Sequence, residues 1–369
     1  MNERSSVKKI GALPYKSILK LVKNGSIKNV VQENIKPASL DLSISDEIYK
    51  VEGIFQPKPN ETVRDVLAQI KKSRHNIKKP LERGSIYVIR LNETLSLPKD
   101  IYAFCNPKST SGRIDTHVRL IADGMPRYDS LQAGFSGEIW ISIMPQSFPI
   151  QVYQGVCLNQ LRFFNADTRI SEKQLVEIMD EHKLLWSRKN QSPYDYSDIK
   201  IRDNDGSLIL TIDLESEVLG FESISSHTPV DLSKISFYNS KKFFKPVKKR
   251  NGYLYLKKDS FYILSTYEAV RVPPQLACEM LPMDERSGDF RSHYAGFIDP
   301  GWGWGKKGEG KGRPLTLEVR PFEDLVVRQG QPIGKIRFEY MSELPEKAYD
   351  SISSNYVEQS GPKLAKHFK

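Results

Sequence analysis

The chain contains one segment twice, and the two copies have kept different polar residues. Residues 84–98 reappear as residues 259–273, with serine, tyrosine, glutamate and proline at matching places, a shift of 175 positions. The same shift relates residues 155–163 to residues 330–338. A repeat of this length predicts two homologous domains in one polypeptide, which restricts the fold more than any other feature of the sequence.

Length and composition agree with two domains. A chain of 369 residues is long for one core, and 39% hydrophobic with 27% charged residues is ordinary for a globular protein. A predicted helix over residues 171–186 serves as the connector, so we place the boundary near residue 200 and expect domains 1–200 and 201–369. The three cysteines lack disulfide or zinc spacing, and no stretch approaches the ~18 apolar residues of a membrane span. We expect a soluble cytoplasmic protein without a membrane partner.

The formal net charge of +10 raises the question of a nucleic-acid partner. The densest basic run, residues 241–250, precedes the second repeat and reads as a surface segment between elements. No helix-turn-helix, RNA-binding sheet or zinc finger accompanies the charge. We therefore expect no nucleic-acid partner, and a small polyanionic substrate accounts for the same balance.

The dominant pattern is short alternating runs broken by turn residues, which is typical of β-structure. Residues 40–44, 138–143 and 315–319 all alternate at period two. Many short strands at close spacing predict a sandwich, jelly roll or barrel. Helical periodicity is confined to residues 15–22, 62–72 and 171–186, the last beginning after a serine suited to capping.

The first segment with chemistry runs from Lys108 through Ser109 and Thr110 to Arg113. A basic residue, small hydroxyls, a glycine and an arginine within six positions can present several donors to phosphate oxygens. The alternative is a turn before a helix, where the hydroxyls only cap. The equivalent stretch of the second copy is acidic, although Arg286 or Arg291 could supply a partial match.

The second copy carries carboxylates that the first lacks. Asp299 begins an Asp-Pro-Gly turn and could hold a sugar hydroxyl, a metal or a water, or form an Asx turn without a ligand. Glu318 alternates with Leu317 and Val319, so it faces either solvent or a site. The first copy has Ser142 in the corresponding place.

These residues resemble the dCTP deaminase family of the dUTPase superfamily, in its double-length form. The similarity covers most of both repeats, with motifs in the same order. The resemblance implies two tandem, distorted jelly-roll or β-barrel dUTPase-like domains with a few short helices, and a homo-oligomer with threefold or pseudo-threefold symmetry. It also implies a deoxynucleoside triphosphate substrate bound between neighbouring domains. The motifs that carry the resemblance are residues 37–42, 108–113, 298–302, 317–318, 330–334 and 354–362.

By this resemblance, one domain contributes Lys108, Ser109 and Arg113 and the other contributes Ala295, Asp299 and Glu318. Hydrolytic deamination of cytosine requires protonation of N3, a deprotonated water and proton delivery to ammonia, and one carboxyl can carry all three transfers if burial raises its pKa. The signatures of zinc deaminases, H-x-E and P-C-x-x-C, are absent. We therefore expect no protein-bound metal and no zinc, with Mg²⁺ accompanying the triphosphate.

The roles follow the same division. Glu318 is the predicted acid–base group, the Ala295 carbonyl orients the water, and Arg113 with Ser109 stabilises charge. Lys108, Thr110 and Asp299 are predicted to bind the nucleotide. The resemblance also implies a C-terminal lid over the triphosphate, although a frayed terminus is the alternative. The expected lid residues are Tyr349, Tyr356, Gln359 and Lys363.

Three functions remain open from the sequence. The first is deamination of dCTP to dUTP and ammonia in deoxynucleotide metabolism. The second is a dUTP diphosphatase, or a bifunctional deaminase–diphosphatase in which Asp299 orients water toward the α-phosphate; a pure diphosphatase would have no use for Glu318. The third is a non-catalytic nucleotide-binding regulator, which the degenerate halves suggest.

Overall fold

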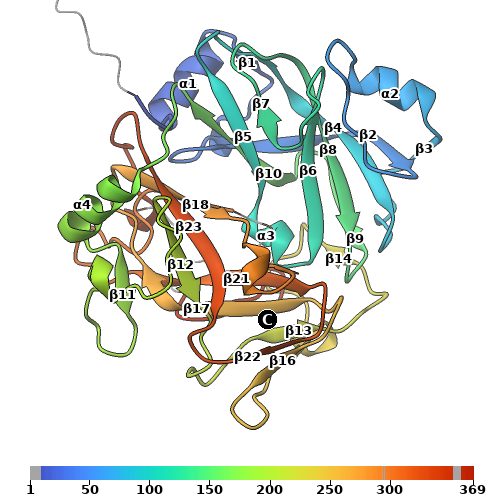
Figure 1. Ribbon diagram of the computed structural model, residues 1–369. Helices are drawn as coiled ribbons and strands as arrows, with labels where there is room; N and C mark the ends of the chain where they lie inside the picture. The colour runs from blue at the N-terminus through green and yellow to red at the C-terminus, as the bar shows by residue number, and fades with distance from the viewer. Residues whose placement is uncertain (1–9, 293, 295, 352–358) are drawn as a thin grey trace, which may run out of the picture.

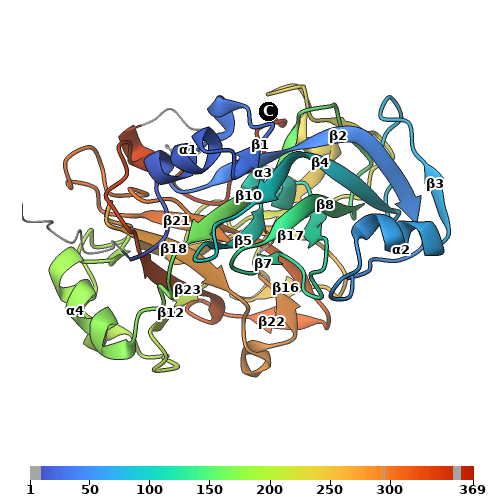
Figure 2. The same ribbon diagram turned by 90° about the horizontal axis from the view of Figure 1, so that it is seen from above.

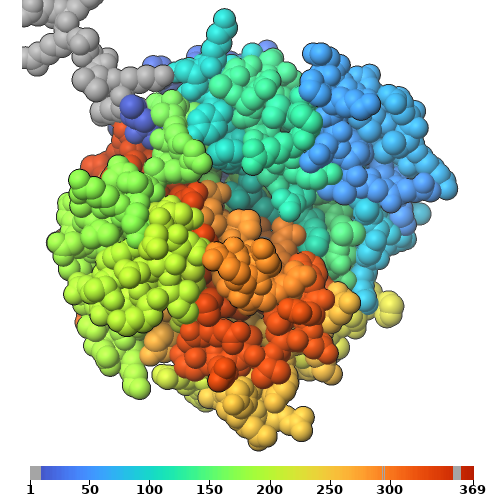
Figure 3. Space-filling view, in the orientation of Figure 1, coloured from blue at the N-terminus to red at the C-terminus, as the bar shows by residue number. Residues whose placement is uncertain are grey.

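The computed structural model describes residues 10–292, 294, 296–351 and 359–369, and it consists mostly of β-strands in two packed domains. Figures 1 and 3 show the N-terminal domain (blue to teal) above the C-terminal domain (green to red). The predicted fold of two tandem jelly-roll or barrel-like domains is thus confirmed. No helix in the described ranges is long and apolar enough to cross a membrane.

The N-terminal domain is built on a nine-stranded antiparallel sheet. Its strand order is β6-β8-β4-β2-β10-β5-β7, with β1 added beside β4 and β3 beside β2. Its nine strands are β1 (Ile27–Lys28), β2 (Leu40–Val51), β3 (Lys72–Arg74), β4 (Ile86–Ser96), β5 (Tyr102–Pro107), β6 (Thr116–Ala122), β7 (Ser130–Leu131), β8 (Ser136–Pro145) and β10 (Cys157–Phe164). A further strand of this domain, β9 (Ile150–Gln151), lies outside the sheet.

The C-terminal domain divides the corresponding strands between two larger sheets. One has the order β15-β13-β17-β21-β19 with β11 beside β17, and the other has the order β12-β23-β18-β20. The strands are β11 (Leu185–Ser187), β12 (Ser207–Thr211), β13 (Phe221–Ser223), β14 (Val230–Asp231), β15 (Phe244–Pro246), β16 (Leu254–Leu256), β17 (Tyr262–Val270), β18 (Leu276–Leu281), β19 (Phe290–Arg291), β20 (Phe297–Ile298), β21 (Arg313–Pro321), β22 (Leu325–Val327) and β23 (Pro332–Tyr340).

The sheet registers show that the sequence repeat is a structural repeat. Val88 pairs with Ser142 in the first domain, and Ile263, 175 positions after Val88, pairs with Glu318 in the second. Ser142 is therefore the structural counterpart of Glu318. By the same comparison Trp140 is the counterpart of Thr316, since Arg90 and Ser265 are their partners.

Three of the four short helices in the described part of the chain lie where the sequence predicts them, although their first and last residues differ from the predicted ones. The helices are α1 (Tyr15–Lys23), α2 (Val63–Gln69), α3 (Ser109–Gly112) and α4 (Glu172–His182), with short 3₁₀ turns at Gln32–Asn34, Tyr196–Asp198, Ser240–Lys242, Glu285–Ser287 and Tyr349–Ser351. The expected helix over residues 171–186 was too long. Lys183 adopts a left-handed conformation (φ 50°) that ends the helix, and Leu185–Ser187 continues as β11. Figure 2 shows α2 and α4 at opposite ends of the molecule.

The second domain also contributes side chains to the core of the first. β14 pairs in parallel with β9, and Phe243, Phe244 and Phe368 are buried in the first domain's hydrophobic core. The prediction that residues 241–250 form a surface segment was therefore wrong for Phe243 and Phe244, which are buried although their neighbours in sequence are basic. The two domains consequently share packed core, which fixes their relative position.

Contacts of the connector and a buried ion pair also fix the position of the two domains relative to each other. Helix α4 packs in the core of the C-terminal domain, and β11 pairs with β17, so both lie with the second domain although they precede residue 200. Across the domain interface, the fully buried Arg162 contacts Glu339 and, at 3.2 Å, Glu279. A buried cation held by two carboxylates tolerates little displacement of either domain.

Candidate active site

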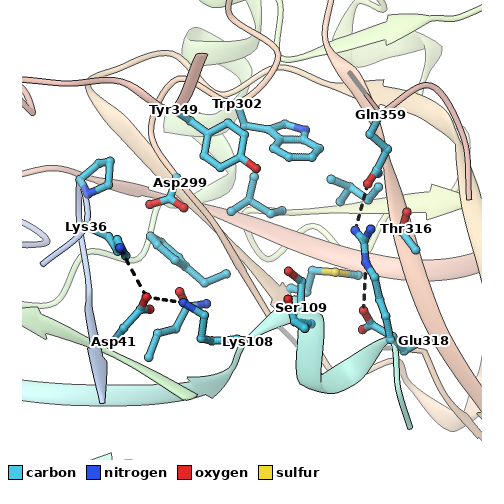
Figure 4. A pocket seen from close by; sticks show the side chains of 18 of the residues that line it. Lys36, Asp41, Lys108, Ser109, Asp299, Trp302, Thr316, Glu318, Tyr349 and Gln359 are labelled. Carbon is cyan, nitrogen blue, oxygen red and sulfur yellow. Dashed lines mark hydrogen bonds and ion pairs between the residues drawn. The ribbon is translucent and has the colours of Figure 1, made fainter. Parts of the chain in front are cut away.

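A cavity of about 460 Å³ lies between the two domains of the single chain. Its walls bring together residues far apart in the sequence (Figure 4). The first domain supplies one side and the second domain with the C-terminal segment supplies the other. Residues predicted from the sequence that line it are Lys108, Ser109, Thr110, Arg113, Asp299, Glu318, Tyr349 and Gln359. The predicted division of residues between two domains is therefore present within one chain.

The helical turn α3 presents the first domain's groups to this cavity. It follows β5 directly, and it is closed by hydrogen bonds from the backbone N–H of Gly112 to Lys108 (3.1 Å) and from that of Arg113 to Ser109 (2.9 Å). Ser111 donates to the backbone oxygen of Leu158 and so ties the turn to the neighbouring strand β10. The residues do form a helical turn, as in the alternative interpretation of the sequence, but Ser109, Thr110 and Arg113 also line the cavity.

Glu318 points into the cavity and not into bulk solvent. Its flanking Leu317 lies in the core, and the Glu318 side chain is only 2% exposed. The Arg113 Nε lies 4.0 Å from Glu318 Oε1, and the backbone N–H of Tyr294 donates to Oε2 at 3.1 Å. Gly112 permits this approach, because a Cβ there would lie 2.9 Å from the Glu318 carboxyl carbon. The carboxylate thus receives both a cation and a backbone donor.

The C-terminal segment reaches the same place. Arg113 donates to the side-chain oxygen of Gln359 at 2.9 Å and to the backbone oxygen of Lys363 at 3.0 Å. Gln359 in turn donates to the backbone oxygen of Pro314 at 2.8 Å. This part of the tail is therefore packed at the site and is not frayed. Tyr356 and Ala295 lie outside the described residues.

An aromatic wall and a cluster of charges complete the cavity. Tyr349 packs against Trp302 with ring centroids 5.1 Å apart. At the other end, Lys108 and Lys36 both contact the buried Asp41. Lys36, Asp41 and Trp302 were not predicted as site residues.

The two carboxylates at this charged end, Asp299 and Asp41, have features typical of a ligand-binding site. Desolvation by the surrounding protein, with the charge of Asp41 as a further cause, raises the pKa of Asp299 to about 7, although part of its side chain still faces the cavity. One oxygen of Asp299 and one of Asp41 are buried without a hydrogen-bond partner in the described part of the protein. Such atoms are usually paired, so they mark where a donor from a ligand fits.

The signal for the missed residues was present but ambiguous. Asp41 lies in the motif 37–42 that carried the resemblance, yet in sequence it is one polar position of an alternating strand. Its partner in the sheet is Gln160, which also lines the cavity. Only the pairing of β2 with β10 shows which face of the strand Asp41 occupies.

A second site could form only if the two copies exchanged roles in a reverse pairing, with the second copy supplying the counterparts of Asp41, Lys108 and Ser109. The second copy lacks these groups. Gln160 pairs with Asp41, and its repeat counterpart Lys335 pairs with Ile209, so an isoleucine replaces the aspartate. By the 175-residue shift, Met283 replaces Lys108 and Asp284 replaces Ser109. Of the two arginines of the partial match, Arg286 is exposed and paired with Asp284 at 2.8 Å. The other, Arg291, lies 4.9 Å from the centre of the Tyr294 ring and does not line this cavity.

In each copy, the surface on which such a second site would form is also covered by another part of the chain. Helix α2 packs Val63 and Leu67 against Trp140, the counterpart of the cavity residue Thr316, and Arg64 lies 5.1 Å from the Trp140 ring. On the other domain, Lys335 is bound by Asp203 and Asp205, in the segment that leads into β12. Elements specific to each copy thus occupy the places where a second site would form.

In the described ranges, no group of three or more His, Cys, Asp or Glu side chains is arranged to hold a metal ion. The three cysteines are free, and burial raises the pKa of the Cys157 thiol to about 12.

Comparison with known proteins identifies relatives over almost the entire chain. Residues 9–167 match the family model of the 2'-deoxycytidine 5'-triphosphate deaminase N-terminal domain, and residues 171–368 match that of the C-terminal domain. The crystal structure of 2'-deoxycytidine 5'-triphosphate deaminase from Agrobacterium tumefaciens is 32% identical, with a TM-score of 0.82 over 92% of this chain and 100% of that chain. A dUMP-forming dCTP deaminase of Dictyoglomus thermophilum is 25% identical over 140 residues, 37% of this chain and 69% of the relative.

Proposed function

Because the chain belongs to the 2'-deoxycytidine 5'-triphosphate deaminase family, we propose that it hydrolyses dCTP to dUTP and ammonia. One observation carries the proposal: the Arg113 guanidinium and the Glu318 carboxylate, from different domains, lie 4.0 Å apart in a cavity shared with Ser109 and the C-terminal segment. A buried carboxylate beside a cation and small hydroxyls is suited to moving protons on a polar heterocycle.

The reaction requires three proton movements. Glu318 takes a proton from water as the oxygen attacks C4 of cytosine, and it delivers a proton to N3. It then transfers the second water proton to the amino group, which leaves as ammonia while the C4 carbonyl forms. Arg113 and Ser109 hold the developing charge and the water in place. The sum is dCTP plus water giving dUTP plus ammonia.

The remaining cavity groups match the other parts of the substrate. Lys108 and Lys366 bring positive charge to the cavity for the triphosphate, whose Mg²⁺ ion enters as part of the substrate. The unpaired oxygen of Asp299 accepts a hydrogen bond from a sugar hydroxyl. Tyr349 and Gln359 line the cavity from the second domain, and the backbone oxygen of Lys363 holds Arg113 beside it.

A second candidate is deamination followed by release of diphosphate. The relative from Dictyoglomus thermophilum is named as dUMP-forming. In this chain Asp299, with its pKa raised to about 7, would orient a second water toward the α-phosphate. Both candidates use the same nucleotide and differ only in the final product.

One incubation separates these functions. Purified protein is mixed with dCTP and Mg²⁺, and ammonia, dUTP, dUMP and diphosphate are measured over time. We expect ammonia and dUTP in equal amounts; dUMP with diphosphate would support the bifunctional reaction. Glu318→Gln keeps the side-chain shape and should lose about 10²–10⁴ in rate while nucleotide binding persists. Binding of dCTP without turnover by the wild-type protein would favour a non-catalytic regulator.

A further inference from the structure

A buried polar cluster lies directly behind Glu318 and joins the two domains. The Tyr294 hydroxyl donates to Asp115 at 2.8 Å, and Arg320 Nε donates to the same hydroxyl at 3.1 Å. Arg320 also forms an ion pair with Asp115. Asp115 is fully buried, Tyr294 is 3% exposed and the Arg320 side chain is 13% exposed. None of these three residues lines the nucleotide cavity.

The cluster is carried by the backbones that present the reacting pair. Asp115 follows Arg113 by two positions, and its left-handed conformation (φ 54°) returns its N–H to the oxygen of Gly112 at 2.9 Å. Arg320 follows Glu318 by two positions on β21, so both side chains leave the same face of that strand. A displacement within the cluster is therefore transmitted to Arg113 and Glu318.

Tyr294 connects the cluster to the carboxylate. Its backbone N–H donates to Glu318 Oε2, while its hydroxyl is held by Asp115 and Arg320. The ring is packed edge-on against His117, with centroids 4.6 Å apart, and lies 5.7 Å from Phe261. Because both ends of Tyr294 are fixed, the direction of its N–H toward Glu318 is fixed as well.

The cluster contains an ion pair between Asp115 and Arg320, and its other groups affect the charge of that pair. Burial raises the pKa of Asp115, and Arg320, Ser147 and Tyr294 oppose that rise. The other charged and titratable groups nearby include Arg119, Asp129, Arg291 and His117, and Arg291 also interacts electrostatically with Glu318. Burial, together with Arg291, Arg320 and Arg119, lowers the pKa of His117 to about 3. His117 therefore stays neutral, and the pair of Asp115 with Arg320 supplies the ionic anchor.

We propose that Tyr294, anchored by Asp115 and Arg320, is a positioning residue that aims Glu318 for proton transfer. The inference rests on the proposed deamination, in which Glu318 moves the protons. A misplacement of a reacting group by about 1 Å can cost ~10²-fold in rate, so a small movement of this anchor is sufficient to matter. The Tyr294 side chain does not line the nucleotide cavity and acts on Glu318 through the tyrosine's own backbone.

The test removes the Tyr294 hydroxyl and keeps its ring. In Tyr294→Phe we expect kcat for dCTP to fall by roughly ten- to a hundredfold, with KM changed by no more than about twofold because the nucleotide contacts remain. The acidic limb of the pH–kcat profile should move upward, since a weakened N–H donor no longer favours the ionised carboxylate. Arg320→Lys keeps the charge opposite Asp115 but removes the guanidinium Nε that donates to Tyr294, and it should show the same pattern more weakly.

The matched control is Tyr87→Phe. Tyr87 is equally buried, and its hydroxyl accepts one hydrogen bond, from the Glu82 N–H at 3.0 Å, away from the site. We expect Tyr87→Phe to lose some stability and to keep the wild-type kcat and pH profile. Equal kinetic losses in Tyr87→Phe and Tyr294→Phe, or wild-type kinetics in Tyr294→Phe and Arg320→Lys, would overturn the inference.

A second readout needs no turnover. With ¹³C-labelled glutamate carboxyls, the Glu318 resonance is assigned by its loss in Glu318→Gln and titrated in each protein. We expect its midpoint to move upward in Tyr294→Phe or Arg320→Lys and to stay in place in Tyr87→Phe; an unmoved midpoint refutes the positioning role. A wild-type protein that does not deaminate dCTP refutes the proposed function, and the titration still decides this inference.

Discussion

Removal of the Arg113 side chain should impair the reaction as severely as removal of the Glu318 carboxylate. In the proposed reaction Arg113 holds the developing charge, and a unit charge about 4 Å from its guanidinium interacts with it by about 4 kcal/mol at an effective dielectric of ~20. If that interaction is fully expressed in the transition state, its loss corresponds to about three orders of magnitude in rate. We therefore expect Arg113→Ala to lose ~10³-fold in kcat/KM for dCTP.

The assay follows ammonia release at several dCTP concentrations, with folding checked by thermal unfolding. Arg286→Ala is the control, because Arg286 is an exposed arginine bound to Asp284 outside the cavity. It should retain nearly wild-type kinetics. A near-normal rate in Arg113→Ala with a large loss in Arg286→Ala would show that the second copy supplies its own arginine, contrary to the reasoning.

Mixing the crippled proteins tests where the site forms. Because Arg113 and Glu318 meet within one chain, co-expression of differently tagged Arg113→Ala and Glu318→Gln chains should restore nothing beyond the sum of their separate rates. If these residues instead pair between chains in an oligomer, some interfaces would join two intact halves and activity would return. Recovered activity in doubly purified protein would contradict the single-chain site.

Three further outcomes are expected. Burial raises the pKa of Glu93 from 4.5 to about 7, so its contribution to stability is complete below about pH 4.5 and is lost as pH rises through 7, by up to roughly 3 kcal/mol. Urea unfolding across this range should show that decline, and Glu93→Gln should reduce it. Chelation of zinc followed by addition of Mg²⁺ alone should leave full activity, whereas a strict zinc requirement would contradict the expectation that water is activated without a protein-bound metal. Light scattering should show a homo-oligomer; a monomer would refute that expectation.

The repeat made much of the fold predictable, because a shift of 175 residues preserves strand registers as well as sequence. Val88 and Ile263, 175 positions apart, pair with Ser142 and Glu318, so the strand pairing is kept although the partner strand is offset by one further residue. Helix ends were less predictable. The connector ends at His182 because one residue, Lys183, turns left-handed, and periodicity carries no information on such a single backbone choice.

Part of the site was beyond the sequence for a different reason. Period-two alternation left Glu318 facing either solvent or a site, and only the approach of Gly112 from the other domain decides between them. Asp115 and Tyr294 belong to no motif, and their hydrogen bond joins residues 179 positions apart. Contacts of this kind depend on how two domains dock, which local patterns do not encode.

The two copies have also become incapable of forming a second site, and this has a measurable consequence. Ser142 replaces the carboxylate in the first copy, and Trp140 beside it is covered by α2. In the second copy Ile209 stands in place of Asp41, and Asp203 binds Lys335. Removing only one of these obstacles would not restore the missing charges, so assembly into an oligomer cannot add nucleotide sites. We therefore expect isothermal titration of Glu318→Gln with dCTP and Mg²⁺ to give one nucleotide per chain. Arg113→Ala, which alters only the intact site, should weaken that single binding event. A stoichiometry of two, or a binding event unaffected by Arg113→Ala, would show that the reverse pairing still holds nucleotide despite its covered faces.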